Sequence, residues 1–76
     1  MKDFTALVTE HFKIATADIA DTLSAKDIPE WDSMNYLLFI ADVEEAYNVS
    51  FTMDEVLGAQ TLGDVKNMLR SKSITI

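Results

Sequence analysis

The sequence predicts an all-α fold, a small four-helix bundle with three main helices and a short third helix. Three stretches repeat apolar side chains at the three- and four-residue spacing of one helix face. An Asp or a Thr, residues that commonly cap helices, stands before each of the four predicted helices. Only 2 glycines and 1 proline interrupt the 76 residues. We therefore expect a single domain over residues 1–76, with a flexible tail at 73–76.

The first helix is predicted over residues 2–14, with Asp3 as its cap. Its core face is formed by Phe4, Leu7, Val8 and Phe12. His11 is the only histidine of the chain, and no second metal-binding residue type stands beside it at helical spacing. We therefore expect His11 to be an ordinary residue at the border of the core, not a metal ligand or a base.

Residues 15–32 lose this periodicity and are predicted to form a long loop. We expect its apolar residues Ile19, Leu23 and Ile28 to anchor it to the core. Pro29 biases Ile28 towards an extended conformation, which stops any helix before the next predicted start. A loop of this length in a small domain indicates a functional loop or one that contains a helical turn of its own.

The central helix is predicted from Ser33 to about Tyr47, and Asn48 is expected to end it. Its core face is formed by Tyr36, Ile40, Val43 and Tyr47, with Phe39 and Ala46 at the edge. The opposite face is also apolar and carries Met34, Leu37, Leu38 and Ala41, with Glu44 and Glu45 one turn further on. A solvated face is normally polar, so we expect a partner to dock on this second apolar stripe.

Two shorter helices follow in the sequence. Thr52 and Glu55 fit a capping box that starts a short helix ending at Gly58. Thr61 and Asp64 start the last helix in the same way, with Asp in place of Glu. The last helix has a core face and a basic C-terminus, formed by Leu62, Val65, Met68 and Leu69, and by Arg70 and Lys72.

The charge balance of the chain excludes some partners. Lys and Arg number 6 against 13 Asp and Glu, which gives a net charge of -7. This charge argues against nucleic acid and anionic membranes and favours basic protein partners. No stretch reaches the roughly 18 apolar residues of a membrane span, and no signal-peptide run opens the chain. We expect a cytoplasmic, monomeric and, because the chain begins with Met1, free-standing protein.

The sequence offers little for catalysis or metal binding. Cysteine is absent, which excludes disulfides, thiolate metal sites and a protein thiol nucleophile. The adjacent Glu44 and Glu45 point about 100° apart on a helix and are poorly placed to act as a pair. The acidic loop over residues 18–32 lacks the residue order of an EF-hand. We therefore expect no catalytic residue and no metal site.

Asp32 and Ser33 form the most informative motif. A serine in the first turn of a helix lies where unpaired backbone N–H groups and the positive end of the helix dipole favour an attached phosphate. Asp and Ser are also the commonest residues at helix starts because they cap, so the dipeptide alone indicates little. The rest of the sequence must decide between these two interpretations.

The surroundings of Ser33 resemble the acyl carrier protein family: Asp-Ser-Met, a hydrophobic helix ending in Val-Glu-Glu-Ala-Tyr, a short helix, and Thr-Leu-Gly-Asp. The resemblance covers roughly residues 7–69 and includes the order and spacing of all helices. The family motif is Asp-Ser-Leu, whose serine accepts 4′-phosphopantetheine from coenzyme A, so the resemblance implies that this arm is attached to Ser33. Asp32 would then help to position the transferase and its metal-bound coenzyme A. Phe51, which we expect to be buried, falls where the family has an apolar residue.

The resemblance implies a carrier rather than an enzyme. Such a carrier holds acyl or aminoacyl intermediates as thioesters on the arm and presents them to partner enzymes of fatty acid, polyketide or related biosynthesis. The absence of cysteine agrees with this, since the arm would bring the thiol. The expected partners are a phosphopantetheinyl transferase and acyl-loading and acyl-transfer enzymes with basic docking surfaces. The expected recognition face is formed by Met34, Leu37, Leu38, Ala41, Glu44 and Val56.

Some residues depart from the family pattern. Met34 replaces the usual leucine with little change in volume. Asn35 and Leu38 stand where fatty-acid-type members often carry acidic residues, so the docking face is more apolar than theirs. Trp31 is similar to carriers of specialised acyl or aminoacyl pathways, but an aromatic that caps the core explains it equally well. An aminoacyl (peptidyl or D-alanyl) carrier, a helical interaction module without a prosthetic group and a regulatory domain phosphorylated on Ser33 remain alternatives.

Overall fold

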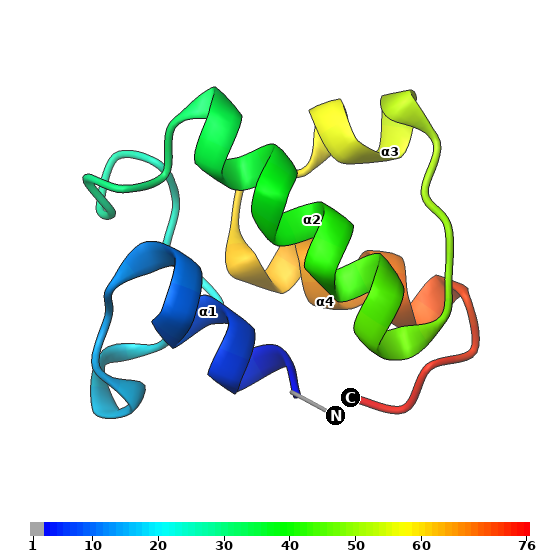
Figure 1. The fold of residues 1–76 in the computed structure, drawn as a ribbon, viewed down its shortest axis with the longest axis horizontal. Coiled ribbons are helices and arrows are strands. Elements are labelled where there is room, and N and C mark those ends of the chain that lie inside the picture. Colours follow the sequence, from blue (N-terminus) through cyan, green and yellow to red (C-terminus); the bar gives the residue numbers. More distant parts are fainter. Residues whose placement is uncertain (1–2) are drawn as a thin grey trace.

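The computed structural model describes residues 3–76, which form four α-helices and one short 3₁₀ turn (Figure 1). The elements are α1 (Phe4–Phe12), η1 (Thr16–Asp18), α2 (Ser33–Tyr47), α3 (Met53–Gly58) and α4 (Leu62–Ser71). The predicted all-α bundle with a short third helix is therefore confirmed. The predicted helix start at Lys2 lies outside the described residues. Within the described part of the chain, no helix has the length and apolar character needed to cross a lipid bilayer.

Helix α1 is closed at both ends by local geometry. Asp3 is its N-cap, as predicted, and the Asp3 carboxylate accepts the backbone N–H of Ala6 at 2.8 Å. Lys13 adopts a left-handed conformation (φ 58°), and its N–H donates to the carbonyl of Thr9 at 3.1 Å. This turn ends α1 at Phe12, before the predicted end at residue 14. Lysine does not favour the left-handed region, so a lysine at position 13 does not indicate that the helix ends there.

Helix α2 begins and ends where the sequence predicts. It ends at Tyr47 because Asn48 is left-handed (φ 55°) and donates its N–H to the carbonyl of Glu44. Tyr47 also ties α2 to α1, since its hydroxyl accepts the backbone N–H of Phe4 at 2.8 Å. This bond satisfies an N–H group at the start of α1 that has no partner within the helix.

Helices α3 and α4 both start with a capping box, as predicted. In α3, the Thr52 hydroxyl accepts the N–H of Glu55 at 3.1 Å, and the Glu55 carboxylate accepts the N–H of Thr52 at 2.8 Å. In α4, the equivalent two bonds between Thr61 and Asp64 measure 3.1 and 3.2 Å. Asp64 therefore replaces the usual Glu in this role.

Each helix contributes buried apolar residues to the core, α3 through Val56 alone. Its buried members are Phe4, Leu7, Val8, Phe12, Ile28, Tyr36, Phe39, Ile40, Val43, Val56, Leu62, Val65 and Leu69. Phe39 was predicted at the edge of this core but is fully buried, with its ring against those of Phe4 and Phe12. Phe51, predicted to be buried, and Met68, predicted on the core face, are only half-buried and pack against the core.

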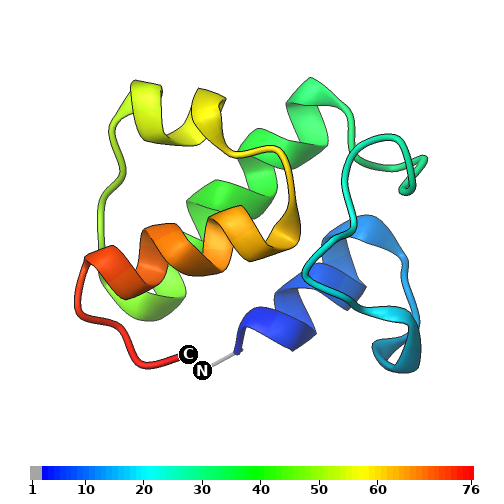
Figure 2. The same ribbon diagram turned by 180° about the vertical axis from the view of Figure 1, so that it is seen from behind.

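The long loop between α1 and α2 contacts the start of α4 (Figure 2). It contains the helical turn η1, and all three predicted anchors pack in or against the core: Ile28, Ile19 and Leu23. The N–H of Leu62 donates to the carbonyl of Leu23 at 3.0 Å. The next N–H, of Gly63, donates to the carbonyl of Asp21 at 2.8 Å. These bonds satisfy N–H groups that α4 itself leaves unpaired.

The last residues pack against the end of α4. The N–H of Ile74 donates to the carbonyl of Leu69, and Arg70 Nε donates to the carbonyl of Ile76, both at 3.1 Å. The side chains of Ile74 and Ile76 are half-buried against the core. The predicted flexibility of residues 73–76 concerns motion and stays a prediction.

Candidate functional site

Ser33 is the first residue of α2 and is exposed to solvent. Asp32 precedes it as the N-cap: the Asp32 carboxylate accepts the N–H of Asn35 at 2.8 Å, and its carbonyl accepts the N–H of Tyr36 at 2.9 Å. At such a helix start, unpaired N–H groups and the positive end of the dipole stabilise an anionic group. The Ser33 hydroxyl is therefore accessible and lies where an attached phosphate is electrostatically favoured.

A hollow of about 250 Å³ adjoins Ser33. It is lined by Ala25, Trp31, Asp32, Ser33, Tyr36, Val56, Leu57 and Ala59. These residues come from the long loop, the start of α2, helix α3 and the connection that follows α3. Most of them are apolar or aromatic, so a group attached to Ser33 finds open space and a largely apolar wall beside it. The residues present thus fit a long arm such as 4′-phosphopantetheine.

Trp31 holds the segment that leads to Ser33 in place. Its ring stacks on Phe12 (centroids 5.1 Å apart, planes at 12°) and on Tyr36 (5.4 Å, 21°). Two stacked neighbours fix the indole against the core while it still lines the hollow. Trp31 is therefore an aromatic that caps the core, one of the two interpretations that the sequence allowed.

Tyr36 links the start of α2 to α3. Its hydroxyl donates to the carbonyl of Val56 at 2.7 Å, a buried hydrogen bond. Burial of this phenol raises its pKa to about 12, and the negative charge of Asp64 adds to the effect. The phenol therefore stays protonated and keeps donating over the whole neutral range, which fixes one wall of the hollow.

The outer face of α2 is apolar and exposed. Met34, Leu37 and Leu38 are 75%, 48% and 55% exposed, and Ala41 is exposed as well. On α3, Met53 and Leu57 are 63% and 71% exposed. We call these six side chains the outer apolar face: Met34, Leu37, Leu38, Ala41, Met53 and Leu57. Its α2 part was predicted from helical spacing, whereas the two residues of α3 were not.

Val56 does not belong to this exposed surface, and its predicted place on the recognition face is wrong. The side chain is 6% exposed and lies in the core. The short length of α3 explains the error, because six residues give too few turns for a stripe to show which side is buried. Leu57, the next residue, is the exposed one.

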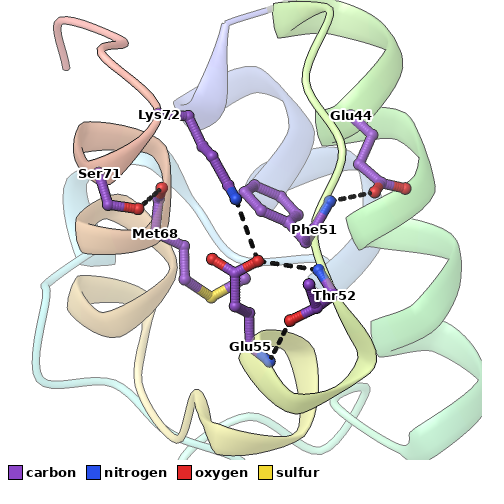
Figure 3. A network of polar contacts seen from close by, with 7 residues as sticks. All are labelled: Glu44, Phe51, Thr52, Glu55, Met68, Ser71 and Lys72. Carbon is purple, nitrogen blue, oxygen red and sulfur yellow. Dashed lines mark hydrogen bonds and ion pairs between the residues drawn. The ribbon is translucent and has the colours of Figure 1, made fainter.

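Glu44, also predicted on the recognition face, is engaged within the molecule (Figure 3). It is half-buried, and its carboxylate accepts the N–H of Phe51 at 2.8 Å. Close by, the Glu55 carboxylate accepts the N–H of Thr52 and binds the ammonium group of Lys72 at 3.1 Å. Both bonds lower the pKa of Glu55, and the bond from the Thr52 backbone has the larger effect. Glu44 thus holds the connection between α2 and α3, and a role in recognition stays a proposal.

His11 lies at the border of the core, as predicted, with 14% of its side chain exposed. Its Nε2 is 2.6 Å from a carboxylate oxygen of Asp42, and its ring meets Phe39 edge-on. The sequence did not indicate the contact with Asp42. Spacing within α1 carries no information about a partner on α2.

Asn35 makes contacts beside Ser33 that sequence reasoning missed. Its Nδ2 donates to the carbonyl of His11 at 2.6 Å and to that of Glu30 at 2.9 Å. The sequence shows only that residue 35 is neutral at a position that is often acidic in fatty-acid-type members. The available signal was an amide with two donor hydrogens three residues after a capping Asp. The sequence near Asn35 does not indicate which carbonyls it would bind.

Comparison with known families covers nearly the whole chain. The family model described as phosphopantetheine attachment site matches residues 3–69, a span that includes Ser33. A search of curated proteins finds no match. Members of the matched family are carriers without catalytic activity, and they hold 4′-phosphopantetheine covalently on a serine. The chain therefore belongs to the phosphopantetheine attachment site family, that of the acyl carrier proteins, as its resemblance predicted.

Proposed function

We propose that this chain is an acyl carrier protein, a single carrier domain whose Ser33 holds 4′-phosphopantetheine. The observation that carries the proposal is the place of Ser33, an exposed hydroxyl on the first residue of α2 beside the 250 Å³ hollow. The family match supports a serine-linked arm. The helix start supports this particular serine, since it stabilises the phosphate of the arm.

Attachment is a phosphoryl transfer from coenzyme A to Ser33. The Ser33 oxygen forms a bond to the phosphorus that carries pantetheine, and the bond from that phosphorus to 3′,5′-ADP breaks. The 3′,5′-ADP leaves with the bonding electrons, and the hydroxyl proton passes to a base of the transferase. The chain itself has only to present the hydroxyl in an accessible and fixed position.

Asp32 has two roles in this proposal. Its carboxylate caps α2 and so fixes the turn that carries Ser33. Asp32 is also exposed, so its carboxylate is available to the transferase. We assign to it the positioning of the transferase and its metal-bound coenzyme A, as the family resemblance implies.

The attached arm supplies a thiol that holds an acyl or aminoacyl group as a thioester. The chain contributes the anchor and the surface on which partners dock. We propose that the outer apolar face, with Glu44 at its border, is this surface. The net charge of -7 steers encounters with basic surfaces of a phosphopantetheinyl transferase and of acyl-loading and acyl-transfer enzymes.

We place the carrier in fatty acid, polyketide or related biosynthesis. Asn35 and Leu38 are neutral where fatty-acid-type members often carry acidic residues. The exposure of Leu38 adds apolar area at that position. The partners of this carrier should therefore depend more on apolar contact and less on charge pairing than those of a fatty-acid-type carrier.

The test is the intact mass of the protein after incubation with coenzyme A and a broad-specificity phosphopantetheinyl transferase. The wild type is expected to gain one phosphopantetheinyl unit, and Ser33→Ala is expected to gain none. A known carrier protein treated alongside shows that the transferase is active. No gain by a folded wild type beside a modified control would favour an interaction module without a prosthetic group.

A further inference from the structure

Asn35 donates three hydrogen bonds beside Ser33, one to the end of α1 and two to residues 30–32. The backbone N–H of Asn35 donates to the Asp32 carboxylate at 2.8 Å. Its side-chain Nδ2 donates to the carbonyls of Glu30 at 2.9 Å and His11 at 2.6 Å. Both side-chain partners are carbonyl oxygens, which only accept, so the amide nitrogen and not the amide oxygen must face them. Both hydrogens of this nitrogen are therefore in use.

The three acceptors place Asn35 at a junction. The carbonyl of His11 belongs to the last turn of α1, where carbonyls have no partner within the helix. The carbonyl of Glu30 lies in the segment that leads to Asp32. Asn35 thus joins the end of α1, the segment before Ser33 and the first turn of α2. We call these three contacts the Asn35 clamp.

The core contacts of α2 begin only after the residue that carries the reacting hydroxyl. Ser33 is exposed and Met34 is 75% exposed, whereas Tyr36 is the first buried residue of the helix, at 8%. Trp31 supports the preceding segment by stacking, but it lies before the turn that carries the serine. Among these residues, Asn35 bonds the turn itself both to α1 and to the loop.

We propose that Asn35 is a positioning residue for attachment of the arm: the clamp directs the Ser33 oxygen towards the transferase. The inference rests on the proposed function of Ser33. It gives Asn35 a role that an acidic residue could not fill. A carboxylate there would face the carbonyl oxygens of Glu30 and His11 and could donate to neither. Asn35→Asp therefore breaks the clamp with almost no change in size.

The test compares Asn35→Asp and Asn35→Ala with the wild type. Asn67→Asp, the same chemical change at an exposed position of α4, is the matched control. For each full-length protein, kcat and KM of phosphopantetheine transfer are measured with coenzyme A and the broad-specificity transferase. Amide hydrogen exchange is measured for residues 33–36 and for the core helices, together with the Tm.

Both Asn35 variants are expected to lower kcat about tenfold while KM changes less than about twofold, since the reacting oxygen is misdirected rather than the docking surface altered. Exchange at residues 33–36 is expected to become about tenfold faster, with core exchange nearly unchanged. Asn67→Asp should change none of these quantities. This separation of kcat from KM is a readout that loss of general stability would not give.

Three results would overturn the proposal. If Asn35→Asp is modified as fast as the wild type or faster, or if only KM changes, residue 35 belongs to the surface that the transferase contacts. If kcat falls together with faster exchange throughout the core, Asn35 supports the fold in general and not Ser33 in particular. Should the wild type itself gain no arm, the proposed function fails and the positioning role fails with it. Exchange at residues 33–36 in Asn35→Asp would then still show whether the clamp exists.

Discussion

Gly63 lies in the first turn of α4, where the long loop contacts the helix. A Cβ at this position would lie 3.1 Å from both the carbonyl oxygen and the Cβ of Asp21. That separation is tighter than ordinary contacts, and one of the two atoms is backbone, which cannot rotate away. At Gly58, the last residue of α3, an added Cβ would meet no atom within 4 Å. A side chain at position 63 would therefore force the loop at Asp21 to shift, whereas one at position 58 would not meet a neighbour.

Gly63→Ala is expected to lower the free energy of unfolding by about 1–3 kcal/mol, because the loop at Asp21 must shift to admit the methyl group. Gly58→Ala is the control and is expected to raise the free energy of unfolding by up to about 1 kcal/mol, since alanine is the better helix former. Urea unfolding followed by circular dichroism measures both. Equal free energies of unfolding for the two variants would show that the loop at Asp21 can shift without destabilising the fold.

At the scale of elements, α3 and α4 depend on a carboxylate at their starts. The backbone N–H of Thr52 and, after it, the ammonium group of Lys72 lower the pKa of Glu55. Backbone N–H groups, that of Gln60 most, lower the pKa of Asp64. A carboxyl whose pKa is lower in the folded state contributes stability above its unfolded pKa. This contribution is lost as the pH falls through the folded pKa.

We therefore expect the Tm of the wild type to fall as the pH drops below the ordinary pKa values of Glu, 4.5, and Asp, 3.8. The fall is expected to be smaller in the double variant Glu55→Gln/Asp64→Asn, because it has lost the two groups whose protonation weakens the caps. Thermal melting followed by circular dichroism between about pH 7 and pH 3 measures the slope. Glu45→Gln, on the exposed side of α2 and outside either capping box, is the control. A double variant with the same slope as this control would contradict the expectation.

At the scale of the whole molecule, α2 separates two apolar surfaces. Phe39 is 0% exposed at the centre of the core, whereas its neighbour Leu38 is 55% exposed on the outer apolar face. On α3, Met53 and Leu57 are exposed as well, and Leu57 lines the hollow beside Ser33. Side chains on the outer face contribute little to folding, so their substitution should affect partners rather than stability.

Leu38→Glu tests this separation of the two surfaces. The free energy of unfolding is expected to change by less than about 0.5 kcal/mol, because the side chain is largely exposed. The kcat/KM of phosphopantetheine transfer is expected to fall about tenfold, since docking would desolvate a carboxylate against an apolar contact.

Ala17→Glu is the matched control, because it adds the same charge at an exposed residue of η1. It is expected to change neither quantity. A large loss of stability in Leu38→Glu would show that Leu38 supports the core. Unchanged kcat/KM in a stable variant would show that the transferase docks elsewhere.

Much of the fold could be predicted because its signals are local. Asp3, Thr52 and Thr61 accept hydrogen bonds from N–H groups three residues away. The cap and its partner therefore lie in the same short stretch of sequence. The buried stripes of α1, α2 and α4 follow from helical periodicity. The end of α1 was missed because Lys13 is left-handed without belonging to a residue type that favours this conformation.

By itself, the sequence determined the all-α class, the starts of α2, α3 and α4, the exposed α2 stripe and membership of a phosphopantetheine-binding family. Only the tertiary structure decided that Val56 is buried, that Glu44 binds the N–H of Phe51, and that Asn35 joins the carbonyls of Glu30 and His11. The physical reason is the range of the interactions. Caps and periodic faces depend on residues within one or two turns, whereas Asn35 reaches a carbonyl 24 residues away and Tyr36 one 20 residues away. Such partners meet only when the helices have packed.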